Sequence, residues 1–440
     1  MSKEVLKTIV LTVLVLTSMY LTWGIWTYAP NSDSIDEQNE YLKTVSTPSS
    51  EELGEIIKPF QIIYSNGYHY YGSTSESIIS EVIDKMSNWD IYDLDQLSSY
   101  TSAEKLRTLS DEKGMIDLVF LDQVPFAIYG QVLNLEENDL SDENFDRMLI
   151  SSRENRVYFI ESDESRVYYG HVKASSVQAL VEQMNKLLSD NNLSQYKALQ
   201  KNENMRPLYV PAKETDVNVY NYFIELINTD TFKETLFEDP SIVTQEATSL
   251  GTEYTDNKTN LLIYDETLTF SYIKPNFNNN YDVSSSSLLE QSLRFMTDKG
   301  SWEKNYHLDE VNTNGKSVSY RLYLKGLPVF NNQGMSEMKQ IWNKNDIHFF
   351  SRPTFTLDFS LPGTSTVTLP SGEAVYRQLI NQAEIDSDLL ECLTIGYKMS
   401  RDNSSTRMVV LEPFWYYKYD GQWIRFTSDD EAGGIANGLE

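Results

Sequence analysis

The longest run of hydrophobic positions lies near the start of the chain, from Thr8 to Ala29, and it contains no charged residue. A helix needs roughly 20 predominantly apolar residues to cross a bilayer, so this run predicts a single N-terminal transmembrane helix. A secretory signal peptide has a shorter apolar core and ends in small residues at a cleavage site. Because Pro30 directly follows the run, we predict an uncleaved signal anchor within residues 1–29.

Two lysines, Lys3 and Lys7, stand before the run. Positive charge is retained on the cytoplasmic side of a membrane, so they predict a cytoplasmic N-terminus and an extracytoplasmic position for the bulk of the chain. One face of the predicted helix follows the alternating four- and three-residue spacing of a helix-packing seam. This seam consists of Thr8, Thr12, Val15, Met19, Thr22 and Trp26. Threonine hydroxyls can hydrogen-bond to a neighbouring helix, but threonine is also tolerated facing lipid. The seam is our candidate interaction face.

After the anchor, the pattern changes to short alternating segments. Residues 30–55 are polar and acidic, which is typical of a stalk between a membrane and a folded region. Residues 56–204 mix strand and helix periodicities, so they predict an N-terminal α+β domain. The predicted elements are hairpins around Asn66-Gly67 and over 156–172, strands over 115–121 and 125–133, and helices that begin near Ser73, Thr101 and Ser175.

The second half of the chain repeats one order of elements. Hairpins are predicted over 261–272 and around Asn314-Gly315, with a helix capped by Ser287 between them. Alternating residues from 352 to 369, a helix from about Gly372 and a hairpin over 392–419 then predict a second copy. We therefore predict two similar domains, 205–330 and 331–440, in which each helix packs on an antiparallel sheet. The fold class is α+β, with one membrane helix and a multi-domain extracytoplasmic region.

Composition adds a folded and strongly acidic exterior. Hydrophobic residues make up 40% of the chain and aromatic residues 12%, and the formal net charge is −29. This charge disfavours nucleic acid and anionic lipid as ligands, and it favours basic protein surfaces or cations. The single cysteine, Cys392, lies in an apolar pattern, so we expect a buried thiol and no internal disulfide. An extracytoplasmic protein without disulfides suits a Gram-positive envelope.

The sequence contains no recognisable catalytic, cofactor-binding or metal-binding motif. The four histidines are far apart, and neither H-E-x-x-H, G-x-S-x-G nor a glycine-rich phosphate loop occurs. Asp90, Asp93 and Asp95 lack the glycine and the distal glutamate of a calcium loop, which favours a solvated turn over a cation site. We predict that the protein is not an enzyme and uses no cofactor.

Aromatic residues are concentrated over 413–423, PFWYYKYDGQW. Alternation along a strand places about half of them on each face. Two interpretations remain open: a contact between sheets or domains, and an exposed protein-binding surface.

Several segments resemble the YycH family: the opening KTIVLTVLVLTSMYLTWGIWTYAP, the modular acidic region after it, GLPVF (326–330) and LEPFWYYKYDGQW (411–423). The resemblance implies a regulator of the WalK/WalR (YycG/YycF) two-component system, which controls cell-wall metabolism in low-GC Gram-positive bacteria. It implies a three-domain ectodomain with two similar last domains and no enzymatic step. It also implies association with the sensor histidine kinase WalK (YycG) and with YycI, largely through transmembrane helices.

We therefore expect a single-pass protein of the cell membrane that binds WalK together with YycI and tunes the activity of the kinase. The alternative function is a membrane-tethered module that binds cell-wall polymer. A tethered hydrolase would need two converging carboxylates about 5–9 Å apart. Homodimerisation, the direction of regulation and any small ligand are left open by the sequence.

Overall fold

The structure, a computed structural model, describes residues 14, 17–19, 48–97, 108–135, 140–199, 207–275, 277–278, 280–300, 302–344, 346–361, 365–381, 385–402 and 405–427. Met1–Ser46 and Thr47–Glu440 form two separate compact units. The second unit consists of antiparallel sheets with a small number of helices, which confirms the predicted α+β class. Most of the predicted signal anchor and stalk lies outside the described residues.

The N-terminal part of the second unit is a nine-stranded antiparallel sheet with the strand order β3-β7-β6-β5-β4-β1-β2-β8-β9. Its strands are β1 (Gln61–Ser65), β2 (Tyr70–Ser73), β3 (Ile91–Gln96), β4 (Ile116–Pro125), β5 (Asn144–Ser151), β6 (Arg156–Glu161), β7 (Arg166–Val172), β8 (Ser194–Leu199) and β9 (Leu208–Pro211). Both predicted hairpins, β1–β2 and β6–β7, are present. Asn66 and Gly67 belong to a four-residue loop in which only Gly67 has a positive φ, so the chain does not reverse through Asn66 and Gly67 alone.

Helices α3 (Glu76–Met86) and α6 (Ala174–Ser189) share one core with this sheet. Their buried apolar residues recur every three or four positions, as expected for amphipathic helices. Along β4, Leu118 belongs to this core, whereas the next residue, Val119, belongs to a second cluster on the opposite face. The sheet is therefore buried on both faces along its central strands.

One predicted strand is a helix. The apolar run over 125–133 forms α5 (Phe126–Val132), which directly follows β4. Pro125 precedes this helix, and a proline with fixed φ and no backbone donor is favourable at a helix start. Phe126 and Tyr129 lie one turn apart and both pack against Phe145 of β5, with ring centroids 4.9 and 5.7 Å away. A short run that is buried on several sides hides its helical period in the sequence.

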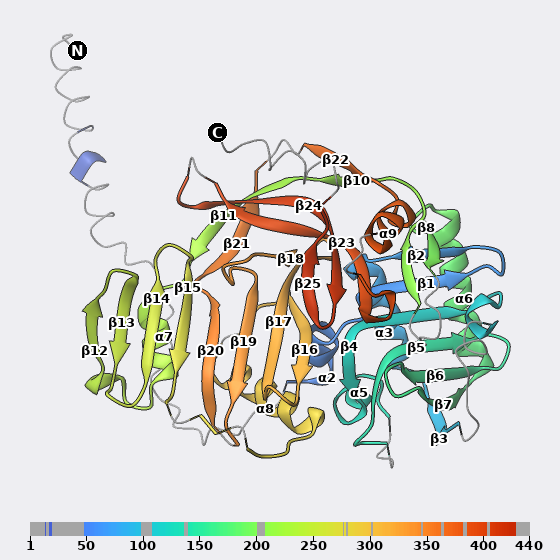
Figure 1. Ribbon diagram of the computed structural model, residues 1–440, viewed down its shortest axis with the longest axis horizontal. Helices are drawn as coiled ribbons and strands as arrows, with labels where there is room; N and C mark the ends of the chain where they lie inside the picture. The colour runs from blue at the N-terminus through green and yellow to red at the C-terminus, as the bar shows by residue number, and fades with distance from the viewer. Residues whose placement is uncertain are drawn as a thin grey trace, which may run out of the picture. The chain divides into compact units, whose positions relative to one another are not determined.

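The remaining strands form a 14-stranded assembly that is antiparallel except for the pairing of β18 with β23 (Figure 1). Its path is β12-β13-β14-β15-β20-β19-β17-β18-β23-β24-β11-β21, with β16 paired to β17 and β25 paired to β24. The strands are β11 (Tyr220–Leu226), β12 (Thr244–Ala247), β13 (Gly251–Thr255), β14 (Asn260–Tyr264), β15 (Thr269–Ile273), β16 (Tyr306–Asn312), β17 (Ser317–Leu324), β18 (Leu327–Phe330), β19 (Glu337–Trp342), β20 (Ile347–Pro353), β21 (Phe355–Ser360), β23 (Leu390–Arg401), β24 (Met408–Tyr419) and β25 (Gln422–Arg425). A separate ribbon pairs β10 (Thr215–Asn218) with β22 (Thr366–Leu369).

Strand β18, which contains most of the GLPVF segment, joins two groups of strands. The first part of β17 pairs with β19, and its last two residues pair with β18. Strand β18 then pairs in parallel with β23. The β17–β18 turn consists of Lys325 and Gly326, whose φ values of 53° and 79° suit a two-residue hairpin turn. In Figure 1, one group of strands stands side by side in the order β12, β13, β14, β15, β20, β19 and β17. Strands β23, β24 and β11 run across the upper ends of this group.

Three helices accompany this assembly: α7 (Thr229–Leu236), α8 (Ser285–Asp298) and α9 (Gly372–Ile380). Helix α8 packs on β16 and β17, and it begins earlier than predicted because Ser284 caps it instead of Ser287. The predicted hairpins β14–β15, β16–β17 and β23–β24 are confirmed. The prediction that the two strands before α9 pair with each other is wrong, because β21 pairs with β11 and β22 pairs with β10.

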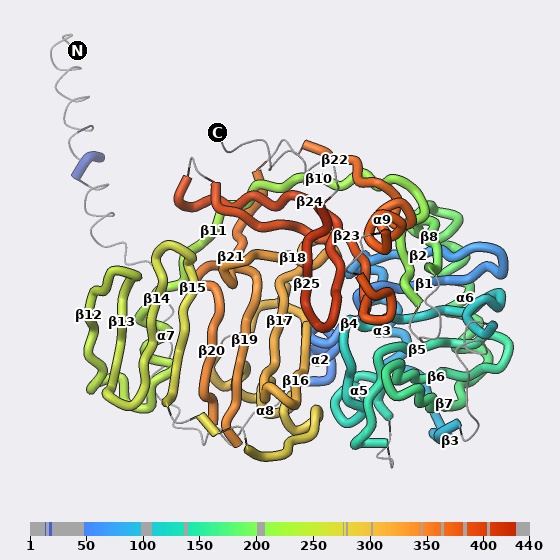
Figure 2. The backbone as a smooth tube through the Cα atoms, in the orientation of Figure 1, coloured from blue at the N-terminus to red at the C-terminus, as the bar shows by residue number. Residues whose placement is uncertain are grey.

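The two sheet systems are in direct contact (Figure 2). One buried cluster combines residues from both: Phe60, Ile63, Val119, Leu121, Tyr196, Tyr209, Tyr323 and Cys392. The backbone N–H of Gly326 donates a hydrogen bond of 3.1 Å to the carboxylate of Glu76, at the start of α3. Ser75 is the N-cap residue of α3 and makes no side-chain capping bond, while Glu76 bonds across to the β17–β18 turn.

Helix α2 (Ser50–Ile56) lies at the end of the segment predicted as a stalk. Ser49 and Glu52 form a capping box that satisfies the first backbone donors of this helix. Leu53 and Ile56 are buried in the main core, and α2 packs against both α5 and β16. Residues directly before the first strand therefore help to connect the two sheet systems.

Candidate functional site

The predicted membrane seam is represented in the described residues by Met19 alone. Met19 is helical and 66% exposed. The other members of the seam lie outside the described residues: Thr8, Thr12, Val15, Thr22 and Trp26. Across the described ranges, the structure contains no helix with both the length and the apolar character needed to cross a membrane.

The four histidines are separate from one another; His69 is exposed, and the other three pack against aromatic rings. His307 is buried and stacks on Tyr323, with ring centroids 4.5 Å apart. Burial, together with the nearby positive charge of Lys58, lowers the pKa of His307 to about 3. His171 and His348 also stack on aromatic rings. In the part of the chain that the structure describes, no three His, Cys, Asp or Glu side chains are arranged to hold a metal ion.

The aspartates near residue 90 are part of an edge strand. Asp93 and Asp95 belong to β3, whose pairing with β7 is interrupted by a bulge, and Asp93 has a φ of +52°. Asp90 pairs with Lys173 across 3.1 Å. The expected solvated turn is thus an exposed, irregular strand.

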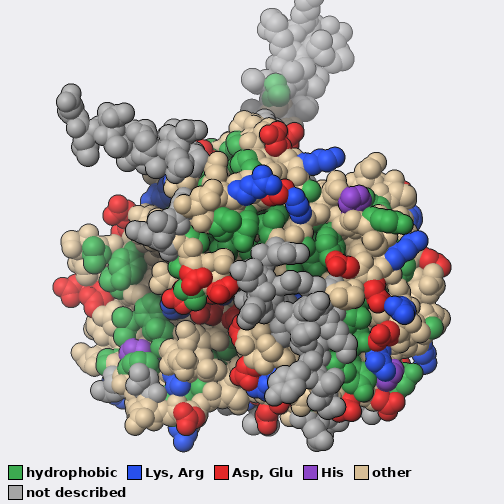
Figure 3. Space-filling model, turned by 45° about the vertical axis from the view of Figure 1, so that its right-hand side comes forward, with side chains coloured by type: hydrophobic (Ala, Val, Ile, Leu, Met, Phe, Trp, Pro, Cys, Tyr) green, Lys and Arg blue, Asp and Glu red, His purple; other side chains and the backbone are tan. Residues whose placement is uncertain are grey.

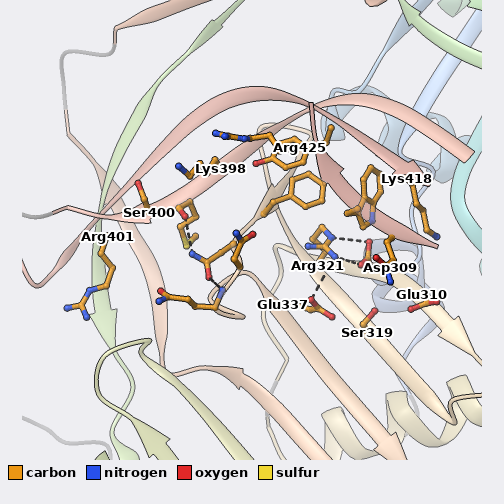
Figure 4. A pocket seen from close by; sticks show the side chains of 18 of the residues that line it. Asp309, Glu310, Ser319, Arg321, Glu337, Lys398, Ser400, Arg401, Lys418 and Arg425 are labelled. Carbon is orange, nitrogen blue, oxygen red and sulfur yellow. Dashed lines mark hydrogen bonds and ion pairs between the residues drawn. The ribbon is translucent and has the colours of Figure 1, made fainter. Parts of the chain in front are cut away.

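A cleft of about 1090 Å³ lies between the two groups of strands that β18 joins (Figure 4). One side comes from β16, β17 and β19, and the other from β23, β24 and β25. Ligand sites in proteins commonly have volumes of about 300–1,000 Å³. The cleft is therefore large enough to hold a small molecule or a short chain segment.

Stacked aromatic rings line the inner part of the cleft. The rings of Phe330 and Tyr416 are nearly parallel, with centroids 3.9 Å apart, and Trp423 lies 5.0 Å from Phe330. Gly396 of β23 makes this arrangement possible, because a Cβ atom at this position would lie 2.6 Å from the Phe330 ring. The missing side chain at residue 396 therefore lets the last residue of β18 cross the face of the sheet.

A buried ion pair holds one wall of the cleft in place. The guanidinium group of Arg321 donates two hydrogen bonds to the carboxylate of Asp309, with lengths of 3.0 and 2.6 Å. The same guanidinium group lies over the ring of Phe330 at 4.7 Å from its centroid. A paired charge that also stacks on an aromatic ring has little freedom to rotate. Arg321 thus links β16, β17 and β18 at the base of the cleft.

The walls of the cleft carry opposite charges. Figure 4 shows Lys398 and Arg425 on one side and Glu337 and Glu310 on the other. Burial raises the pKa of both glutamates above the usual range. In a chain with 65 acidic and 36 basic residues, the lysine and arginine side chains on one wall are a local exception. The face of the molecule in Figure 3 shows acidic side chains scattered among polar and hydrophobic ones.

The aromatic stretch over 413–423 belongs mainly to the interior. Trp415, Tyr416 and Tyr417 are buried, and Tyr416 faces the cleft. Trp423 packs against the cluster that contains Tyr209 and Cys392. These contacts confirm the interpretation as a contact between sheets. The predicted burial of Cys392 is also confirmed.

Sequence reasoning did not identify the cleft residues. Arg321 is the only charged residue in the apolar strand SVSYRLYL, and Asp309 stands beside Glu310 in YHLDEV. A charge at an inward position of a strand usually requires a buried partner. Inward-facing charges of opposite sign could have predicted that the strands of Arg321 and Asp309 pair with each other. They could not have predicted that a cleft lies beside these strands.

Two antiparallel sheet systems, joined by a buried aromatic cluster and flanked by a charged cleft, define the class of this protein as a multi-sheet α+β protein. The family description "YycH protein, N-terminal domain" matches residues 4–189, and "YycH protein, C-terminal domain" matches residues 205–431. The chain therefore belongs to the YycH family, and the resemblance in the sequence is confirmed.

A similar sequence and a similar solved structure both carry the name YycH and come from Bacillus subtilis. "Two-component system WalR/WalK regulatory protein YycH" of strain 168 is 24% identical over 98% of this chain and 97% of its own length. The crystal structure of YycH from B. subtilis superposes with a TM-score of 0.71 at 20% identity, and the match covers 87% of this chain and 98% of that chain. The second comparison shows that the fold is shared.

Proposed function

We propose that this protein is a membrane-anchored regulator of a WalR/WalK two-component system and has no enzymatic role. The observation that carries the proposal is the similarity to the B. subtilis relative, which is described as a WalR/WalK regulatory protein. This similarity extends over 98% of the chain, so it includes both the N-terminal hydrophobic run and the folded sheets.

In this proposal, the chain contacts WalK through the seam of its membrane helix, from Thr8 to Trp26. The N-terminus is cytoplasmic, and the folded unit is extracytoplasmic. YycI is a further partner, and the complex tunes kinase activity and thereby cell-wall genes. The uncharged run from Thr8 to Ala29 and the lysines before it support this topology. The boundaries 56–204, 205–330 and 331–440, and the similarity of the last two domains, remain predictions.

The energy required for such regulation is small. A regulator shifts the balance between two kinase conformations only by binding one of them more tightly than the other. A difference of about 1–3 kcal/mol changes that balance roughly 5- to 150-fold. Interhelical hydrogen bonds in membranes contribute about 0.6–2 kcal/mol each. Two or three threonine hydrogen bonds that form with only one of the kinase conformations would therefore be sufficient to change the balance by this amount.

The test uses cells that lack their own copy of the gene and carry a reporter for a WalR-controlled cell-wall gene. Four forms are compared: the full chain, residues 1–50, the full chain with Thr8, Thr12 and Thr22 changed to Leu, and the full chain with Thr17→Leu. Thr17 lies on the opposite face of an ideal helix, so Thr17→Leu is the matched control.

We expect the full chain and Thr17→Leu to restore reporter output and the triple Leu variant to fail. Restoration by residues 1–50 would assign a modulating role to the folded unit. Full restoration by the triple variant would contradict the seam. If the full chain leaves the reporter unchanged, regulation itself is contradicted, and binding to isolated wall material then tests the alternative of a wall-polymer module.

A further inference from the structure

The cleft between the two groups of strands contains basic side chains without acidic partners. Lys398 lies on β23 and Arg425 on β25, both on the same wall (Figure 4). Within the described residues, no carboxylate lies within ion-pair distance of either side chain. The guanidinium group of Arg425 is held over the ring of Phe414, 4.8 Å from its centroid. One wall thus presents two cations to the space of the cleft, and Phe414 holds one of them, Arg425, in position.

The facing wall contains carboxylates whose nearby cations also pair with other carboxylates: Lys418, which lies near Glu310, pairs with Glu391 across 3.4 Å. Glu310 and Glu337 are both partly buried. The nearest cation to Glu337 is Arg321, at 3.9 Å, and its guanidinium group is already occupied by two hydrogen bonds to Asp309. Burial raises the pKa of both glutamates, which means that their charged forms are incompletely compensated. An ammonium group in the cleft would supply the missing charge.

The surface between these walls suits the body of a short peptide. Phe330, Tyr416 and Trp423 form an apolar surface that is fixed by stacking and by Arg321. Polar side chains of Asn332 and Gln333 line the same cleft and can bond to peptide groups. A pocket with an apolar surface and a few placed polar groups is the usual form of a ligand site.

The charges decide among ligand classes. A polyanion would meet the carboxylates of one wall, and a polycation would meet the lysine and arginine of the other. A neutral glycan would leave both sets of charges without compensation. We propose that this cleft binds a short peptide that carries both an ammonium group and a carboxylate group, with the carboxylate at Lys398 and Arg425 and the ammonium at Glu310 and Glu337.

The test measures which peptides the full chain retains. The purified full-length protein, in detergent micelles, is dialysed against four pools of tetrapeptides with acetylated and amidated ends. The pools contain one Lys and one Glu, two Glu, two Lys, or no charged residue. Mass spectrometry quantifies the retained peptides. We expect the mixed-charge pool to be retained at least tenfold better than the other three.

A charge reversal makes the test independent of folding. The variant Lys398→Glu with Arg425→Glu places two carboxylates where the ligand carboxylate would bind, while Arg401 and Lys418 stay in the cleft, so preference should move towards the pool with two Lys. The matched control, Lys186→Glu with Lys213→Glu, has the same change in net charge at exposed positions outside the cleft, and it should keep the mixed-charge preference. Equal retention of all four pools by the natural chain, or an unchanged preference in the double variant, would overturn the proposal. Neither outcome depends on the regulation of WalK.

Discussion

At the scale of single residues, charged side chains are buried where strands need to be held in a fixed register. Arg147 and Asp117 pair inside the N-terminal sheet, and Arg321 and Asp309 pair at the base of the cleft. In each case the guanidinium group contacts both carboxylate oxygens. Such geometry compensates much of the desolvation of the two ions, and it fixes the two strands relative to each other.

Removing one partner of the second pair should destabilise the fold strongly. Arg321→Ala leaves the Asp309 carboxylate buried without its cation, and this typically costs about 3–5 kcal/mol. Arg153 pairs with Glu112 at the surface with 76% of its side chain exposed, so Arg153→Ala should cost less than about 1 kcal/mol. Urea unfolding of both variants measures the difference. Equal effects would mean that the buried pair contributes no more than an exposed one.

His307 should make stability depend on pH. Its pKa in the fold is about 3, below the ordinary value of 6.5. Between pH 6.5 and pH 3, the unfolded chain therefore binds a proton at this histidine that the folded chain does not bind. The stabilising effect is therefore complete above pH 6.5 and is lost progressively as pH falls towards 3. Between pH 7 and pH 5 the natural chain should lose about 2 kcal/mol more than His307→Gln. Urea unfolding at both values checks this. If both proteins lose the same free energy of unfolding between the two pH values, His307 does not have the lowered pKa described above.

At the scale of elements, the hairpins formed by consecutive strands were predictable. The pairing of strands that are far apart in the sequence was not. Asp420 and Gly421 have positive φ values in a two-residue turn between β24 and β25, and Asp-Gly is a favoured pair for such a turn. By contrast, β18 pairs with β23 across more than 60 residues of sequence, and nothing in GLPVF indicates that partner. Local turn chemistry is present in neighbouring residues, whereas strand order depends on contacts that form only in the folded chain.

The turn that precedes β18 should be sensitive to a single methyl group. A Cβ atom at Gly326 would lie 1.9 Å from the carbonyl oxygen of Thr74, whereas one at Gly334 would meet nothing within 4 Å. Both glycines have a φ of +79°, so an alanine at either position carries the same backbone strain of about 1 kcal/mol. We expect Gly326→Ala to lower the free energy of unfolding by about 2 kcal/mol more than Gly334→Ala.

The matched pair isolates the contact between the two sheet systems, because only Gly326 touches the N-terminal part. Thermal or urea unfolding of both variants is the measurement. Indistinguishable stabilities would mean that the β17–β18 turn can move away from Thr74 and Glu76 without loss, and that this contact does not join the sheets.

At the scale of the whole molecule, the periodicity of the sequence predicts the α+β fold class, and the resemblance to the YycH family predicts a regulatory role. The cleft was not predictable from either. Arg321, Phe330 and Glu337 come from three strands, while Lys398 and Arg425 come from two others far along the chain. Their convergence depends on β18 joining two groups of strands and on the absence of a side chain at Gly396. No local pattern contains that information.

In the proposed function, the chain changes the activity of WalK through its predicted membrane helix. The most direct measurement is the rate of WalK autophosphorylation in proteoliposomes, with and without the full-length protein. We predict a several-fold change in rate that is kept by Thr17→Leu and lost when Thr8, Thr12 and Thr22 are all changed to Leu. The same rate with and without the full-length protein, both inserted in the bilayer, would contradict it.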